Sequence, residues 1–411
     1  MAISSAEPPP TPSLHGKTRI VITGLGCVSP LGPDVPTFWR RLLAGESGID
    51  DMTKLDTTGL RNPRGGEVHG FDWELFGDEG DCDEASQFAF AAVHEAIADA
   101  HLLDPDLALT GLVFSTNFGG AASWEAACDL ASAGSADAEL FGQFLPAHAA
   151  DYTAGRLGIG GPRRTLSNAC SSGANAIGAA ADWLRLGRCE IAIAGGHDSL
   201  GLSSLAGLSI LRTISPDEIR PFDVGRNGTL FGEGAGVLVL ETWESAERRN
   251  AKVYAELVGW GLNNNAYHLT APDKEGAGLA AVMRAALADA GMVPHEIDYV
   301  NAHGTGTQYN DLAETQAIRT VFGTHADALA VSSIKAATSH TMAAAGALEA
   351  IASAMAIVDQ TLPPTIHYQT PDPQCDLDYV PNAARKAPIR AVLSNSSGIG
   401  GNNASLVFRA V

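Results

Sequence analysis

A cysteine placed directly before a predicted helix is the residue of this sequence best suited to nucleophilic chemistry. Cys170 stands between a short polar run, residues 165–169, and small residues that lead into an apolar helical pattern, residues 171–184. A thiol at this position would face the positive end of the helix dipole, which lowers its pKa. Free backbone N–H groups beside it could hold an oxyanion. Because a lone cysteine is more often a buried structural residue, the assignment depends on the rest of the sequence.

Two histidines lie at junctions similar to that of Cys170. His303 stands in NAHGTGT (301–307), and His340 stands in SSIKAATSHTMAAAGALE (332–349), which also contains Lys335. Most of the 12 histidines are expected to be ordinary core or surface residues. His303 and His340 differ because each follows a predicted buried strand and has small residues around it. Three strand-to-loop junctions therefore offer Cys170, His303 and His340 as candidate reactive residues.

The elements that must position these residues alternate between strands and helices. Buried strands are predicted at 19–25, 111–115, 190–196, 237–240, 253–261, 297–301, 329–333, 391–395 and 405–409. Helices are predicted at 85–101, 278–290 and 311–322. This alternation predicts an α/β fold with mostly parallel, buried sheets. Residues 1–17 are expected to be a disordered lead-in, followed by an N-terminal half, 18–258, and a C-terminal half, 259–411.

Composition excludes several classes of function. The 411 residues include 45% hydrophobic ones, enough for a large core, and the net charge of −21 argues against a nucleic-acid or anionic-membrane partner. Six scattered cysteines without a CxxC pair argue against structural zinc and fit a reducing cytoplasm. The alanine-rich segment 341–358 contains Gly346 and Glu349, so it predicts a buried core helix rather than a membrane span.

Six blocks occur in the order typical of one enzyme family. They are GLGCVSPLG (24–32), ACSSG (169–173), RPFD (220–223) with GEGAG (232–236), the two histidine blocks, and SNSSGIGG (394–401). From about residue 19 to residue 409 the chain resembles the β-ketoacyl-acyl-carrier-protein synthases, condensing enzymes of the thiolase superfamily, and among them the elongating synthase II type. The resemblance implies a thiolase-like five-layer αβαβα sandwich built from two similar halves. Cys170 would belong to the first half and both histidines to the second.

The resemblance also implies a reaction. Cys170 would take an acyl group from an acyl carrier protein as a thioester. A malonyl thioester would then lose CO2, and His303 and His340 would donate hydrogen bonds to the enolate oxygen. The backbone N–H groups of Cys170 and Ile399 would bind the oxyanion formed during attack on the acyl group. The product would be a β-ketoacyl carrier protein, and no metal or redox cofactor is implied, since the substrates are carried on a phosphopantetheine arm.

Other residues receive supporting roles by the same resemblance. Lys335 would lie beside the reacting groups and belong to a network that orients His340. The carboxylates expected in that network are Asp311, Glu314 and Glu349. The residues expected to contact the pantetheine arm or the substrate are Thr270, Thr305, Thr307, Phe118 and Phe231.

Several residues depart from the synthase II pattern. Ser397 and Ile399 stand where phenylalanines are usual, Ser339 where glycine is usual, and Asn227 where aspartate is usual. Together they predict an enzyme of specialised fatty-acid or polyketide metabolism, with altered gating of the acyl pocket. Phe118 aligns near the floor of that pocket and predicts a limited acyl chain length.

The resemblance predicts a dimer and an acyl carrier protein as partners. Because carrier proteins are acidic, a local basic patch must receive them; the candidates are Arg61, Arg64, Arg163, Arg164 and Arg212. The dimer could pair two copies of this chain or pair this chain with a chain-length factor. A chain-length factor itself lacks the nucleophilic cysteine, so Cys170 argues against that identity.

Two further alternatives concern the chemistry. A transacylase or decarboxylase on the same fold would use half of the reaction cycle. The spacing from Cys170 to His303 also fits a papain-like protease, but the cysteine of that family lies near the N-terminus and precedes an aromatic residue.

Overall fold

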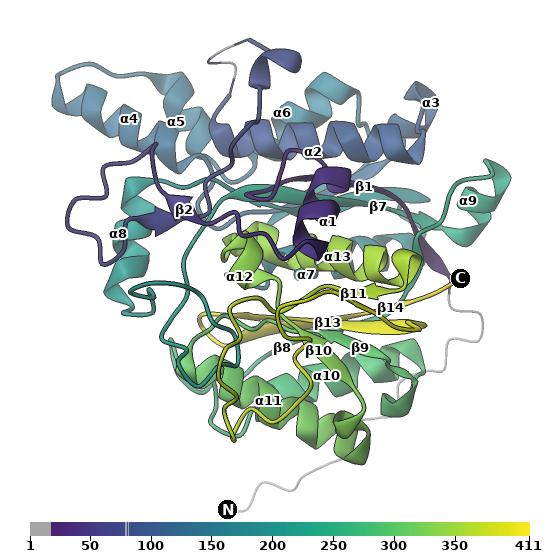
Figure 1. The fold of residues 1–411 in the computed structure, drawn as a ribbon. Coiled ribbons are helices and arrows are strands. Elements are labelled where there is room, and N and C mark those ends of the chain that lie inside the picture. The colour runs from purple at the N-terminus through teal and green to yellow at the C-terminus, as the bar shows by residue number, and fades with distance from the viewer. Residues whose placement is uncertain (1–17, 79, 81) are drawn as a thin grey trace, which may run out of the picture.

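The computed structural model describes residues 18–78, 80 and 82–411; the expected lead-in, 1–17, lies outside the described residues. Five layers are stacked in Figure 1. Helices α2 (Glu84–Ala100) and α6 (His148–Leu157) cover the first sheet layer, and α10 (Ala277–Ala290) and α11 (Gln308–Phe322) cover the second. Between the sheet layers lie α7 (Ser172–Arg185) and α13 (Ala345–Asp359). The expected αβαβα sandwich is confirmed.

The strands of each half follow one pattern. The first half contains β1 (Ile20–Val28), β4 (Gly111–Ser115), β5 (Arg163–Leu166), β6 (Ile191–Asp198) and β7 (Gly234–Thr242). The second contains β8 (Ala255–Asn264), β9 (Tyr299–Asn301), β10 (Ala330–Ser332), β13 (Ala391–Gly398) and β14 (Asn402–Arg409). The full order is β10-β9-β13-β14-β8-β1-β7-β6-β4-β5. The strand orders of the two halves therefore mirror each other about the β1–β8 pair, although the sequence shows no repeat that indicates this symmetry.

The sheet is mixed, which corrects the expectation of mostly parallel strands. β4 runs parallel to β5 and β6, and β9 runs parallel to β10 and β13, but the pairs β6–β7, β7–β1, β13–β14 and β14–β8 are antiparallel. One cause is local: the left-handed glycines Gly400 and Gly401 reverse the chain between β13 and β14. β1 and β8 join the halves through Val21–Glu256 and Ile22–Ala255. The expected boundary between residues 258 and 259 falls inside β8.

The remaining elements surround this frame. The other helices are α1 (Val35–Leu43), α3 (Asp104–Leu107), α4 (Ala121–Ser132), α5 (Ala138–Phe144), α8 (Leu202–Ile210), α9 (Trp243–Arg248) and α12 (Lys335–Thr338). Short turns of 3-10 helix are η1 (Trp73–Leu75), η2 (Pro294–Glu296), η3 (Gly323–Asp327) and η4 (Met342–Ala344). Two small sheets pair β2 (Asp50–Asp51) with β3 (Arg64–Gly65), and β11 (Thr361–Leu362) with β12 (Arg385–Lys386).

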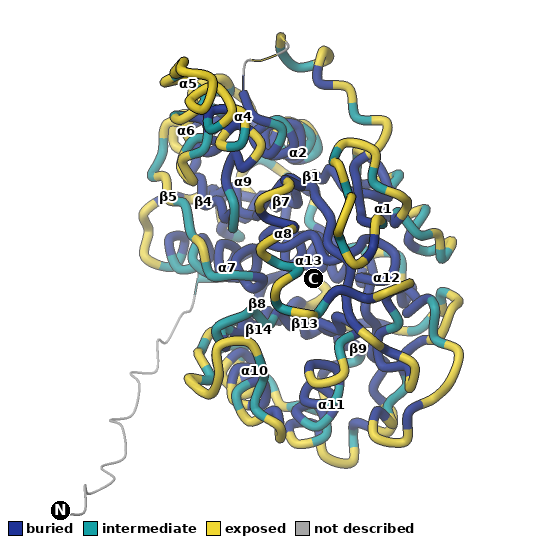
Figure 2. Tube along the Cα trace, turned by 90° about the vertical axis from the view of Figure 1, so that its left-hand side faces the viewer, coloured by how far each residue is buried: buried dark blue, intermediate teal, exposed yellow. Residues whose placement is uncertain are grey.

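The two helices of the middle layer, α7 and α13, are mostly buried, as the dark-blue parts of their trace show in Figure 2. The segment Met342–Asp359 is long and apolar enough to cross a membrane, yet 83% of it is buried within the fold, which confirms the expected core helix. α7 and α13 approach closely near their N-termini. A Cβ added at Gly173 would lie 2.6 Å from the Ala343 carbonyl oxygen, and one at Gly346 would lie 2.8 Å from the Ala174 nitrogen. This close approach brings the turns before the two helices together.

Candidate active site

Cys170 lies in a tight turn between β5 and α7. The preceding Ala169 has a φ of 52°, a left-handed conformation that is unfavourable for a residue with a side chain. Ser172 holds the turn: its Oγ donates to the Ala169 oxygen at 2.5 Å and accepts from the Asn168 N–H at 2.7 Å. Cys170 is thus buried at the start of the helix, in a backbone shape that its neighbours enforce.

Burial governs the protonation of this thiol. It raises the pKa of Cys170 to about 11, while hydrogen bonds from the Ile399 and Cys170 N–H groups and the charge of Lys335 lower it less strongly. The expectation of a lowered pKa is therefore wrong for the resting protein, because removal from water outweighs the favourable dipoles. The same contacts put the sulfur next to the two backbone N–H groups expected to bind an oxyanion.

The loop after β9 presents His303, and carboxylates from α11 shape its backbone. Glu314 accepts from the N–H groups of His303 at 2.8 Å and Gly304 at 2.9 Å. Asp311 accepts from the N–H groups of Phe222 at 2.8 Å and Gly306 at 3.2 Å. Both carboxylates are fully buried. Asp311 and Glu314 therefore fix the backbone of the loop. Among the described residues, neither carboxylate forms a hydrogen bond with an imidazole.

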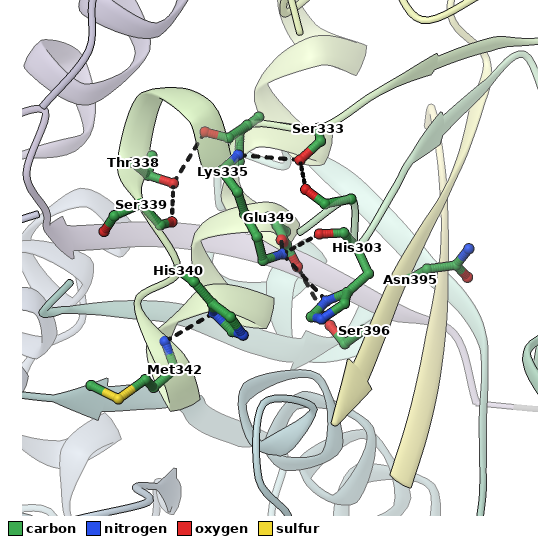
Figure 3. A network of polar contacts seen from close by, with 12 residues as sticks. His303, Ser333, Lys335, Thr338, Ser339, His340, Met342, Glu349, Asn395 and Ser396 are labelled. Carbon is green, nitrogen blue, oxygen red and sulfur yellow. Dashed lines mark hydrogen bonds and ion pairs between the residues drawn. The ribbon is translucent and has the colours of Figure 1, made fainter. Parts of the chain in front are cut away.

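Lys335 contacts His303 rather than His340. Its Nζ donates to the His303 carbonyl oxygen at 2.6 Å, lies 3.3 Å from His303 Nδ1, and forms an ion pair with Glu349 (Figure 3). The expected orientation of His340 by this network is thus corrected. His340 is held by its own turn, where the Met342 N–H donates to Nδ1 at 3.3 Å.

Both imidazoles have the same tautomer. An ammonium group and a backbone N–H can only donate, so Nδ1 accepts in His303 and in His340, and Nε2 carries the proton. Burial, together with the charge of Lys335, holds the pKa of both histidines well below its usual range. The centroids of the two neutral rings lie 5.4 Å apart, and the ring planes form an angle of 84°. Each of the two rings therefore offers one Nε2–H donor.

Two cavities meet at Cys170. The first has about 330 Å³ and is lined by Cys170, His303 and His340. Its lining also includes the expected Thr270, Thr305, Thr307, Phe231 and Ile399. The second has about 260 Å³, and its walls are Asn117, Phe118, Ser167, Ala169, Cys170, Leu208, Phe231, Met342 and Ile399. Cys170, Phe231 and Ile399 line both, so the thiol stands between the first, named here the outer cavity, and the second, named here the inner cavity.

The candidate arginines lie on several segments of the chain. Arg212 lines the first cavity, whereas Arg163 and Arg164 lie on the edge strand β5, where Arg163 pairs with Asp151 at 3.2 Å. Arg61 is exposed, and Arg64 donates to the Ile49 carbonyl oxygen at 3.0 Å.

Some residues of the site were not anticipated. Asn395 donates to Glu314 at 3.2 Å, and Ser333 Oγ donates to the Gly304 oxygen at 2.7 Å. Asp198, at the end of β6, accepts bonds from two separate segments. Asn395 belongs to the block at 394–401, which offered a signal, while nothing in the sequence around Asp198 distinguished it.

The fold and the site define a thiolase-like α/β enzyme with a buried cysteine beside two neutral histidines. Two family models match the sequence: "Beta-ketoacyl synthase, N-terminal domain" over residues 17–246 and "Beta-ketoacyl synthase, C-terminal domain" over residues 254–369. The chain belongs to the beta-ketoacyl synthase family and is an acyltransferase. The resemblance is confirmed, and the family assignment contradicts the protease alternative.

Individual relatives agree along almost the whole chain. 3-oxoacyl-[acyl-carrier-protein] synthase 2 of Staphylococcus aureus (strain N315) is 41% identical over 407 residues, covering 95% of this chain and 98% of the relative. The enzyme of the same name from Coxiella burnetii is 40% identical over 412 residues, covering 96% and 99%. Among solved structures, "The ishigamide ketosynthase/chain length factor" has a TM-score of 0.91 and 36% identity, covering 96% of this chain and 100% of that chain. A type II PKS acyl-carrier protein in complex with its ketosynthase has a TM-score of 0.89 and 33% identity, with the same coverage.

Proposed function

We propose that this protein condenses an acyl group held on Cys170 with a malonyl group on an acyl carrier protein, in a specialised fatty-acid or polyketide pathway. The observation that carries the proposal is the convergence of Cys170 and two neutral Nε2–H donors on one cavity. Relatives named as synthases of acyl-carrier-protein substrates support the choice of donor.

The first step is acyl transfer. The Cys170 sulfur attacks the thioester carbonyl of the acyl carrier protein, and the N–H groups of Cys170 and Ile399 stabilise the oxyanion. Collapse breaks the bond to the pantetheine sulfur, which takes the proton that Cys170 loses. Because one thioester replaces another, the acyl group stays activated.

The second step forms the new carbon–carbon bond. The malonyl thioester loses CO2, and the electron pair of the broken bond moves into an enolate whose oxygen accepts from His303 and His340. C2 then attacks the acyl carbonyl, and the Cys170 thiolate leaves. Loss of one such donor typically costs about 3–4 kcal/mol of transition-state stabilisation. Lys335 keeps His303 Nδ1 occupied as an acceptor, so the proton stays on Nε2.

The remaining residues support binding and selectivity. Thr270, Thr305 and Thr307 line the outer cavity and would contact the pantetheine arm, while exposed Arg212 at the same cavity would meet an acidic carrier protein. Ile399 would gate the inner cavity, whose Phe118 wall would limit acyl length.

We extend the proposal to assembly and location. The strand order ends at β5, so its outer edge is available to a second subunit, either a copy of this chain or a chain-length factor. A ketosynthase/chain length factor among the similar structures favours the second arrangement. Six free cysteines support a reducing cytoplasm. The division into 18–258 and 259–411 remains a proposal; the mirrored strand order favours two halves, although it assigns all of β8 to the second.

Intact-protein mass spectrometry tests the reaction. Incubation with short acyl carrier proteins should add the acyl mass to the wild type and not to Cys170→Ala, and malonyl carrier protein should then convert the adduct to β-ketoacyl product. Turnover of the malonyl donor without condensation would instead favour a decarboxylase, and transfer alone a transacylase. If the wild type shows no adduct until a chain-length factor is co-purified, the heterodimer is the active form.

A further inference from the structure

A single buried carboxylate connects the two sides of the inner cavity. Asp198 ends β6 and is fully buried. Its Oδ1 accepts from Thr116 Oγ1 at 2.7 Å and from the N–H groups of Asn117 at 2.9 Å and Phe118 at 3.0 Å. Its Oδ2 accepts from the Ala343 N–H at 2.9 Å. Four donors from two distant segments thus meet on one side chain.

One of these segments is a wall of the inner cavity. Asn117 and Phe118 both line it, and their backbone N–H groups are the ones that Asp198 binds. Asn117 Oδ1 also lies 3.3 Å from Ser172 Oγ. Because Ser172 holds the turn that carries Cys170, a series of polar contacts runs from Asp198 through the cavity wall to that turn.

The other segment is the turn that holds His340. Ala343 follows Met342, whose N–H donates to His340 Nδ1 and whose side chain lines the inner cavity. A shift of this turn would therefore move two things at once: the Met342 N–H that fixes the His340 tautomer, and the part of the cavity wall that Met342 forms.

We propose that Asp198 is a positioning residue for the condensation: it holds the acyl-cavity wall at 116–118 and the His340 turn in one arrangement, so that acyl fit and the donor geometry of His340 are set together. The inference rests on the proposed function of His340 and Cys170. A carboxylate suits the position because it is acceptor-only when ionised, and all four partners are donors. An amide would face one of those donors with its own N–H groups.

The charge of Asp198 also acts on the nucleophile, in addition to its hydrogen bonds. Asp198 raises the pKa of Cys170, opposing Lys335, which lowers it; the nearby His303 and His340 are neutral. Loss of the carboxylate charge should therefore lower the pKa of the Cys170 thiol.

The test compares Asp198→Asn with Glu95→Gln. Glu95 is a matched control because its carboxylate also accepts two backbone N–H bonds, from Cys27 and Val35, each at 2.8 Å, outside both cavities. Urea unfolding gives the stability loss of each variant. Alkylation of Cys170 by iodoacetamide across pH, followed by peptide mass mapping, gives its apparent pKa. Decarboxylation of malonyl carrier protein and acylation by donors of increasing length report on His340 and the cavity.

The expected result is specific to Asp198→Asn. Its apparent alkylation pKa falls by about one unit, its decarboxylation rate falls about tenfold, and its preference among acyl donors changes, while Glu95→Gln matches the wild type in all three. The proposal would be overturned if the two variants lost equal stability and showed the same alkylation pKa, decarboxylation rate and acyl preference.

A second variant and a separate readout keep the outcome decisive. If Asp198→Asn does not fold, Thr116→Val removes one donor and leaves the carboxylate; an unchanged acyl preference would then refute the positioning role. If the wild type neither acylates nor decarboxylates, the proposed function fails, whereas the alkylation profile still reports on Asp198.

Discussion

Replacing Lys335 by methionine should destabilise the protein by an amount that grows with pH. Lys335 and Glu349 are each 1% exposed, and their ion pair is the only one that the described chain gives either residue. The substitution keeps an aliphatic chain but leaves the carboxylate buried without its cation. Breaking a buried pair in this way typically costs about 3–5 kcal/mol.

The pH dependence follows from Glu349. Burial raises the pKa of this carboxyl to about 7 in the wild type, with Lys335 as the main opposing influence. A carboxyl whose pKa is raised by folding stabilises the protein at low pH, and this stabilisation is lost as the pH rises to the pKa of the folded state. In the wild type the loss of unfolding free energy from Glu349 therefore ends near pH 7. In the Lys335→Met variant the pKa of Glu349 in the folded protein is higher still, so the free energy of unfolding continues to fall above pH 7. The extra slope is about 1.4 kcal/mol per pH unit, or about 2 kcal/mol between about pH 7 and about pH 8.5.

Urea unfolding followed by circular dichroism at these two pH values measures the effect. The matched control is the double variant Lys335→Met with Glu349→Gln, which removes both charges and should unfold with little extra pH dependence above pH 7. A Lys335→Met penalty that stays constant with pH, or a double variant with the same added slope, would refute the reasoning.

Two further substitutions test other features. Ser339 has φ 62° and ψ −176°, a backbone region used almost only by glycine, and its Oγ has no hydrogen-bond partner among the described residues; Ser339→Gly should raise the free energy of unfolding by about 1 kcal/mol. A lower value in thermal or urea unfolding would mean that its side chain is needed to fill the space between Gly66 and Gly232. Phe118→Ala should enlarge the 260 Å³ inner cavity and raise the rate with long acyl donors relative to short ones. An unchanged ratio in acylation assays would show that Phe118 does not limit chain length.

Local motifs predicted much of the molecule. Short contiguous motifs surround Cys170, His303 and His340, and Cys170 and His303 each follow the end of a strand, so their meeting in one cavity could be expected. His340 differs from that expectation, because the helix α12 separates it from β10. The direction of sheet pairing could not, because a buried apolar run has the same pattern in parallel and antiparallel sheets. The pairing partner of β1 across the first half is β7, far along the chain.

Properties that depend on tertiary environment were missed or reversed. Lys335 lies five positions before His340, yet α12 and the following turn direct its Nζ to His303. The sign of the Cys170 pKa shift depends on how completely the thiol is withdrawn from water. Asp198 carries no motif, since its four donors come from residues 116–118 and 343.

The position of β1 has a consequence for biosynthesis. All nine residues of this apolar strand are buried between β8 and β7, but β1 begins at Ile20 whereas β7 begins only at Gly234. At about 5–20 residues per second, the ribosome needs roughly 10–40 s to make the partner after the strand has been made. For that interval the nascent chain holds an unpaired strand prone to wrong association, and this is when a ribosome-associated chaperone would protect it most.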